Sequence, residues 1–116
     1  MRTGRGARRC TMLRIHDVML DAITTMRPML AAIERQDRDL GSQLRRAASS
    51  VVLNLAEGSG SAGGVRTQRY RTALGSARET MACLLVAERF GYVEGTPEEL
   101  RALMNCVVGT LVRVAM

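Results

Sequence analysis

Residues 43–64 read QLRRAASSVVLNLAEGSGSAGG, a basic segment rich in small residues that ends in a run of glycine and serine. Within it, Leu44, Ala48, Val51 and Leu55 follow one another at steps of four, three and four residues. This spacing puts the four side chains on one face of a helix and is typical of a bundle core. The stretch therefore predicts an amphipathic helix over residues 42–57.

The ends of this helix carry residues that often begin and end helices. Ser42 can act as the N-cap, and Gly58 is a residue type that commonly follows a helix. We expect residues 58–64 to form a flexible connector. The flanks of the apolar stripe are small (Ala47, Ser49 and Ser50), so a neighbouring helix can approach closely.

Three further segments show helical spacing of apolar residues, at 13–36, 66–90 and 97–115. Pro28 predicts a kink or a break in the first of them. Gly75, inside the next, costs roughly 1 kcal/mol relative to alanine, which a close helix crossing would offset. The last begins with Thr96, Pro97 and Glu99, the pattern of a capping box.

These four segments, with no sustained two-residue alternation and 3% aromatic residues, predict an all-α chain. The simplest arrangement is an up-down-up-down antiparallel four-helix bundle over residues 13–116. Residues 1–12 are expected to be a flexible basic arm, and Tyr92 and Val93 to fold back on the bundle. The three aromatic residues, Phe90 included, are expected to be buried.

The 116 residues fit one domain, and no apolar run is long enough to cross a membrane. We expect a cytoplasmic protein. Three cysteines (Cys10, Cys83 and Cys106) without C-x-x-C spacing argue against a disulfide framework or a zinc site. Cys83 and Cys106 are predicted to be small core residues.

Catalytic chemistry finds no support in the sequence. Di-iron bundles need Glu-x-x-His motifs, but Leu13 stands three residues before His16, the only histidine. Nothing pairs that histidine with a serine or cysteine nucleophile. The glycine-rich connector lacks the Gly-Lys-Ser/Thr ending of a phosphate loop. We predict a non-enzymatic protein with no metal and no cofactor.

Asn54 and Glu57 form a polar pair one helical turn apart, beside the apolar stripe. A carboxylate in the last turn of a helix opposes the helix dipole, so a partner is expected. The candidates are Arg78 and the free backbone amides at the start of the following helix. The pair is interpreted as a structural cap or network.

The arginines are the residues in the sequence that indicate a function. The formal charge is +6, and every basic residue apart from the histidine is arginine. Arginine suits phosphate contacts, and the five candidates could converge at one end of the bundle. The alternative is that they pair with acids such as Asp37, Asp39 or Glu79. With so few aromatics, nucleic-acid binding would be phosphate-led and salt-dependent. The candidate contact residues are Arg45, Arg46, Arg66, Arg69 and Arg71.

Several parts of the chain resemble the family of four-helix bundle proteins known as 23S rRNA intervening-sequence, or S23, proteins. The resemblance lies in residues 43–58, which follow the pattern Q-L-R-R-A-x-x-S-x-x-x-N-I-A-E-G except that Leu55 replaces the isoleucine. It continues in Ala73-Leu74-Gly75-Ser76 with Glu79, and in the closing Gly91-Tyr92-Val93.

The resemblance implies a cytoplasmic bundle that assembles into a cyclic homopentamer. It implies two functional hypotheses. The first is a non-enzymatic oligomeric scaffold that presents a basic surface to a protein or nucleic acid. The second is an accessory variability protein of a diversity-generating retroelement, which binds RNA or cDNA and a reverse transcriptase. Val52, Val108, Val112 and Met29 lie beside the core stripes and suggest apolar surface beyond one bundle's needs.

Overall fold

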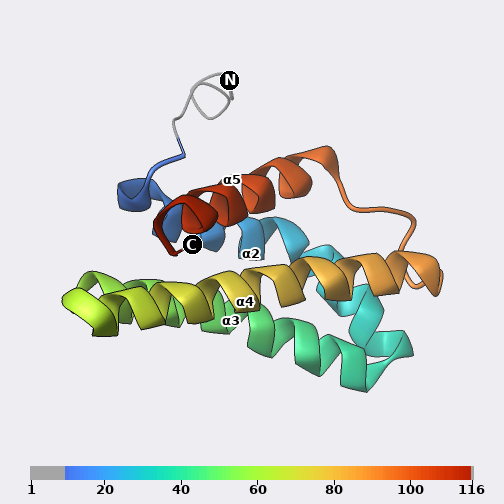
Figure 1. The fold of residues 1–116 in the computed structure, drawn as a ribbon. Helices are drawn as coiled ribbons and strands as arrows, with labels where there is room; N and C mark the ends of the chain where they lie inside the picture. Colours follow the sequence, from blue (N-terminus) through green and yellow to red (C-terminus); the bar gives the residue numbers. More distant parts are fainter. Residues whose placement is uncertain (1–9, 116) are drawn as a thin grey trace.

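The computed structural model describes residues 10–115, and in that range the chain forms four α-helices (Figure 1). The helices run alternately up and down, each packs along its neighbour in sequence, and the last closes back on the first. The predicted all-α four-helix bundle is therefore confirmed. The helices are α2 (Met12–Gln36), α3 (Arg38–Ser59), α4 (Gly63–Arg89) and α5 (Glu98–Ala115).

The core is built from the predicted apolar stripes. All four stripe residues of the 42–57 segment are buried, and α2 and α5 contribute most of the large buried side chains. Leu85 and Val114 have the spacing of core residues in the 66–90 and 97–115 segments, and the sequence therefore predicts their burial, but they are about half exposed, at 51% and 43%. The fully buried large side chains are Ile15, Met19, Met26, Ile33, Leu44, Val51, Leu100, Met104, Val107 and Leu111.

The turn between α2 and α3 is a single extended residue, Asp37, with φ −152° and ψ 92°. Its carboxylate accepts a hydrogen bond from the Leu40 amide at 3.0 Å and so caps α3. The prediction of Ser42 as N-cap is wrong, because the N-cap is Asp37, five residues earlier. Gly41 permits the tight turn, since a Cβ there would stand 2.5 Å from Cγ of Glu34.

The turn between α3 and α4 is also shorter than predicted. Helix α3 continues to Ser59 and α4 begins at Gly63, so only three residues connect them. Gly58 is not a residue that follows the helix but a buried helical residue. A Cβ at Gly58 would lie 2.4 Å from Cε1 of Tyr70, so the glycine lets α4 approach α3.

The prediction that another helix crosses closely at Gly75 is wrong. Gly75 is exposed, and a Cβ built on it meets nothing within 4 Å. The predicted break at Pro28 is also absent, since α2 runs through it as one helix. The close approach between α3 and α4 depends on Gly58 instead.

The segment between α4 and α5 is held against the bundle by core packing and by a hydrogen bond. Tyr92 and Val93 pack against the core as predicted, and the Tyr92 hydroxyl donates to the Asp37 carboxylate at 3.0 Å. That hydrogen bond, together with burial, raises the pKa of the Tyr92 phenol. Phe90 contradicts its predicted burial, because it is 67% exposed and stacks on the Tyr92 ring.

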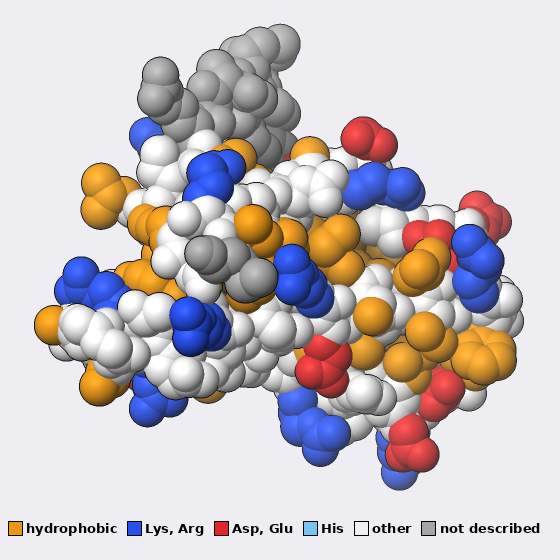
Figure 2. Space-filling model, viewed as in Figure 1, with side chains coloured by type: hydrophobic (Ala, Val, Ile, Leu, Met, Phe, Trp, Pro, Cys, Tyr) orange, Lys and Arg blue, Asp and Glu red, His pale blue; other side chains and the backbone are white. Residues whose placement is uncertain are grey.

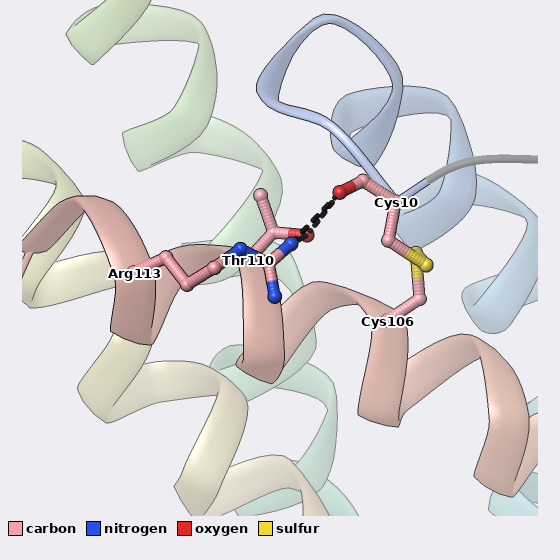
Figure 3. Close-up of a disulfide and its surroundings, with 4 residues drawn as sticks. All are labelled: Cys10, Cys106, Thr110 and Arg113. Carbon is pink, nitrogen blue, oxygen red and sulfur yellow. Dashed lines mark hydrogen bonds between the residues drawn. A yellow bond between two sulfur atoms is a disulfide. The ribbon is translucent and has the colours of Figure 1, made fainter.

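Cys10 and Cys106 form a disulfide, with their Cα atoms 5.4 Å apart (Figure 3). The prediction against a disulfide is therefore wrong. The two cysteines are 96 residues apart in sequence and meet because α5 packs beside the start of α2, which sequence spacing does not reveal. Cys106 is accordingly only partly buried, whereas Cys83 is a buried thiol as predicted.

The structure describes only residues 10–12 of the predicted flexible arm. Residues 1–9 lie outside the described residues, and Met12 already belongs to α2. Within the described chain, no helix combines the length and apolar character needed to cross a bilayer.

We predict that Gly58→Ala lowers the free energy of unfolding by about 1–2 kcal/mol, because the added methyl group displaces the Tyr70 ring from its contact with α3. Urea denaturation followed by circular dichroism measures the change. Gly75→Ala is the matched control and should raise stability by up to about 1 kcal/mol, since its methyl group meets open space. Equal shifts for the two variants would contradict this assignment.

Candidate functional site

The structure separates the five candidate arginines into two groups. Arg66, Arg69 and Arg71 lie on the first turns of α4, at the end of the bundle where α3 finishes. Arg45 and Arg46 lie on α3, roughly 20 Å from that end at 1.5 Å per residue. The expected convergence of all five at one end is wrong, because α3 and α4 are antiparallel.

Two further arginines complete the group at the start of α4. Helix α2 begins at this end of the bundle and contributes Arg14, and α5 finishes there and contributes Arg113. In Figure 2 basic side chains lie at both ends, whereas the visible acidic side chains lie from the centre toward the right and not at this end, on the left. We call Arg14, Arg66, Arg69, Arg71 and Arg113 the basic end.

Three arginines of the basic end are held by backbone carbonyls. Nε of Arg66 donates to the Gly58 carbonyl at 3.2 Å, and Nε of Arg71 donates to the Ala115 carbonyl at 3.1 Å. Arg113 donates through Nη2 to the carbonyl of Cys10 at 3.0 Å. These contacts fix the arginines without cancelling their charge, because a carbonyl is neutral.

The carbonyls of Gly58 and Ala115 belong to the last turns of α3 and α5, where the regular intrahelical donors end. The Gly58 carbonyl also accepts a hydrogen bond from the Ser61 amide at 3.1 Å. The negative end of the helix dipole favours a cation at such a position. Because Arg66 and Arg71 donate there through Nε, their Nη groups retain hydrogens for another acceptor. The geometry can therefore offer oriented guanidinium groups to an anion.

The alternative interpretation, pairing with acids, applies to two of the five candidates. Arg45 donates through Nε and Nη2 to one oxygen of Glu34, at 3.2 and 2.7 Å. Arg69 pairs with Glu57 at 3.0 Å. Neither acid is among those expected. Arg46 is exposed on the outer side of α3.

Asn54 and Glu57 have separate roles. Asn54 is buried and donates through Nδ2 to the carbonyl and hydroxyl oxygens of Ser50, at 2.9 and 3.1 Å. The Ser50 hydroxyl is hydrogen bonded to that of Ser76 on α4 at 2.7 Å. Glu57 pairs with Arg69 at the surface, not with Arg78. A partly buried polar contact between α3 and α4 therefore runs through Ser50, and Asn54 supports Ser50 from within α3.

A groove of about 260 Å³ lies between α4 and α5, at the end opposite the basic end. Apolar side chains line it, and Glu88, Thr96 and Arg101 stand among its polar residues. Glu88 accepts hydrogen bonds from both the amide and the hydroxyl of Thr96. The hydroxyl bond is the main cause that lowers the pKa of Glu88, and Arg101 and Arg89 add to it. Glu88 is thus an ionised anchor of the loop before α5.

Exposed apolar residues continue from this groove to the end of α4. Leu85, Val86 and Phe90 are 51%, 39% and 67% exposed. Figure 2 shows hydrophobic side chains gathered over this end of the molecule, on the right. We call these three residues the apolar end. The sequence suggested other residues for such a surface, but Met29 is buried and the three valines pack against the core.

Within residues 10–115, no group of three or more His, Cys, Asp or Glu side chains is placed to hold a metal ion. Burial raises the pKa of the Cys83 thiol, and the nearby Glu79 carboxylate raises it further. Cys83 is therefore a poor nucleophile.

Comparison with known proteins points to one family. Residues 21–112 match the model of the family described as 23S rRNA-intervening sequence protein. The fold is similar to the crystal structure of a protein of unknown function from the S23 ribosomal protein family of Bacteroides thetaiotaomicron. The TM-score is 0.69 with 18% sequence identity, over 87% of this chain and 97% of that one. Comparison with curated proteins gives no significant match.

We predict that Asn54→Ala lowers the free energy of unfolding by about 1–3 kcal/mol, because it removes a buried amide that satisfies the Ser50 oxygens. Glu57→Ala should cost less than about 1 kcal/mol, since its ion pair with Arg69 is half exposed. Urea denaturation measures both changes in the free energy of unfolding. A larger loss for Glu57→Ala than for Asn54→Ala would show that the surface pair contributes more to stability than the buried amide that supports Ser50.

Proposed function

The chain belongs to the 23S rRNA-intervening sequence protein family, and we propose that it acts as a non-catalytic cytoplasmic scaffold. In this proposal copies of the chain assemble through the apolar end. The basic end then binds the phosphate backbone of a nucleic acid.

The observation that carries the proposal is how the arginines of the basic end are held. Arg66, Arg71 and Arg113 are oriented by backbone carbonyls and keep their full charge. Oriented arginines are suited to phosphate oxygens, which accept two parallel hydrogen bonds from one guanidinium group. Such contacts carry no base sequence information, so the binding would be non-specific.

The apolar end supports assembly of the chain with itself. Leu85, Val86 and Phe90 are exposed within six residues of one another, and Leu85 also lines the apolar groove between α4 and α5. Exposed apolar residues that lie together often mark an interaction surface. Charges of both signs border them, with Arg89 next to Phe90 and Glu94 on the following loop. A surface that carries both signs can complement a second copy of itself, whereas a nucleic acid would be repelled by its acids.

We predict that the protein runs as an oligomer of its 12.7 kDa chain at micromolar concentration in light-scattering chromatography. The double variant Leu85→Ser/Phe90→Ser should run as a monomer, because it removes the apolar contact. Leu53→Ser/Val65→Ser is the matched control, since these residues are equally exposed elsewhere and should leave assembly intact. A strictly monomeric wild type would overturn this part of the proposal.

For nucleic-acid binding, we predict that the protein binds RNA and DNA of mixed sequence at low salt, as measured by fluorescence anisotropy. Affinity should fall steeply as salt rises, because binding releases counterions from the phosphates. Arg66→Gln/Arg71→Gln should reduce the slope of log affinity against log salt by about 1–2.

The control for this titration is Arg45→Gln/Arg46→Gln, which removes the same charge away from the basic end. It should leave the slope near that of the wild type. No binding at low salt, or equal effects of the two double variants, would refute the basic end as the contact surface.

A further inference from the structure

The Cys10–Cys106 disulfide is one of three contacts that join the segment before α2 to α5 (Figure 3). The Thr110 hydroxyl donates to the Cys10 carbonyl at 3.0 Å, and Nη2 of Arg113 donates to the same oxygen at 3.0 Å. Cys106, Thr110 and Arg113 are spaced by four and three residues, so they share one face of α5. We call these three contacts together the latch.

We propose that the latch is a reversible thiol–disulfide site, in which Thr110 and Arg113 position Cys10 for exchange. Both hydrogen bonds are lost when the reduced segment opens, but neither involves a sulfur atom, so both form again when it closes on α5. In the closed position the Cys10 thiol lies close to Cys106, and the disulfide can form again. The bonds raise the effective concentration of one thiol at the other.

Two further features favour exchange over a permanent cross-link. Both cysteines are partly exposed, so a thiol from solution can reach the sulfurs, whereas Cys83 is buried. Cys10 precedes the first residue of α2, and the segment can leave α5 without breaking a hydrogen bond inside the helix. Opening the latch therefore does not require the bundle to unfold.

The reaction consumes one equivalent of a dithiol, or two of a monothiol such as glutathione. A reductant thiolate attacks one sulfur of the pair, and a mixed disulfide forms as the other sulfur leaves as a thiolate. A second reductant thiolate then displaces the remaining cysteine. Two electrons and two protons pass to the protein, which gains two thiols, and the reductant becomes a disulfide.

Opening the latch has two consequences. The face of α5 that carries Cys106, Thr110 and Arg113 loses its cover, beside an open hollow of about 420 Å³ that residues 10–12 help to line. Reduction also frees Cys10, which directly follows Arg8 and Arg9 in the sequence, from its covalent bond to α5.

The test is a thiol count on the native full-length protein, equilibrated in glutathione buffers from oxidising to reducing. Each sample is quenched with acid, alkylated in denaturant and weighed by mass spectrometry. We expect one alkylated cysteine, Cys83, in oxidising buffer and three in reducing buffer, with circular dichroism unchanged. Three in every buffer would show that the pair does not form. One in every buffer would show a permanent cross-link. Either result overturns the proposal.

The role of the positioning residues has its own readout. Thr110→Val and Arg113→Gln should each lower the ratio of disulfide to dithiol by about fivefold at fixed buffer, the effect of losing about one hydrogen bond. Arg78→Gln, a surface change on α4, should leave the ratio unchanged. Thr110 is buried, so a poorly folded Thr110→Val would not be informative. In that case Arg113→Gln, a change at the surface, tests the positioning role. A wild-type ratio in Arg113→Gln would overturn the positioning role.

Discussion

The close packing of α3 against both of its neighbours is the constraint on which the rest of the fold depends. At one end, Gly41 lies against Glu34 and allows α2 and α3 to be joined by one residue. At the other end, Gly58 lies against the Tyr70 ring and allows a three-residue turn into α4. Turns this short force neighbouring helices to run antiparallel, so α5 can only close the ring between α4 and α2. The antiparallel order of neighbouring helices therefore depends on the absence of a side chain at Gly41 and at Gly58.

Apolar periodicity was enough to predict the helices and most of the core, because burial follows the 3.6-residue repeat directly. The residues that join the helices were harder to predict. A serine and a glycine in the expected cap positions, Ser42 and Gly58, suggested longer connectors than exist. Local sequence preference cannot distinguish a glycine that ends a helix from one that admits a neighbour, since both need a missing side chain. Gly75 shows the opposite error, because it has no neighbour at all.

The candidate site depended on contacts between distant segments, and these were the least predictable. Arg66 and Arg71 were identified by charge alone, but their carbonyl partners follow from where α3 and α5 end. The disulfide between Cys10 and Cys106 spans nearly the whole chain, and an odd number of cysteines gives no sign of it. Leu85 showed the right spacing for a core residue but lies where α4 has no helix to cover it. In each case the missing information was which helices are adjacent.

The two ends of the bundle differ in how their arginines are held, and the difference has a simple electrostatic consequence. A carboxylate beside an arginine, as at Arg45 and Glu34, gives a fixed but nearly neutral pair. A backbone carbonyl beside Arg66 or Arg71 fixes the side chain and leaves a whole positive charge. If copies assemble through the apolar end, each basic end remains uncovered and the charges of several copies add. Among residues 10–115, anchoring to helix-end carbonyls thus gives the bundle oriented guanidinium groups at one end, and the interface that we propose between copies lies at the other.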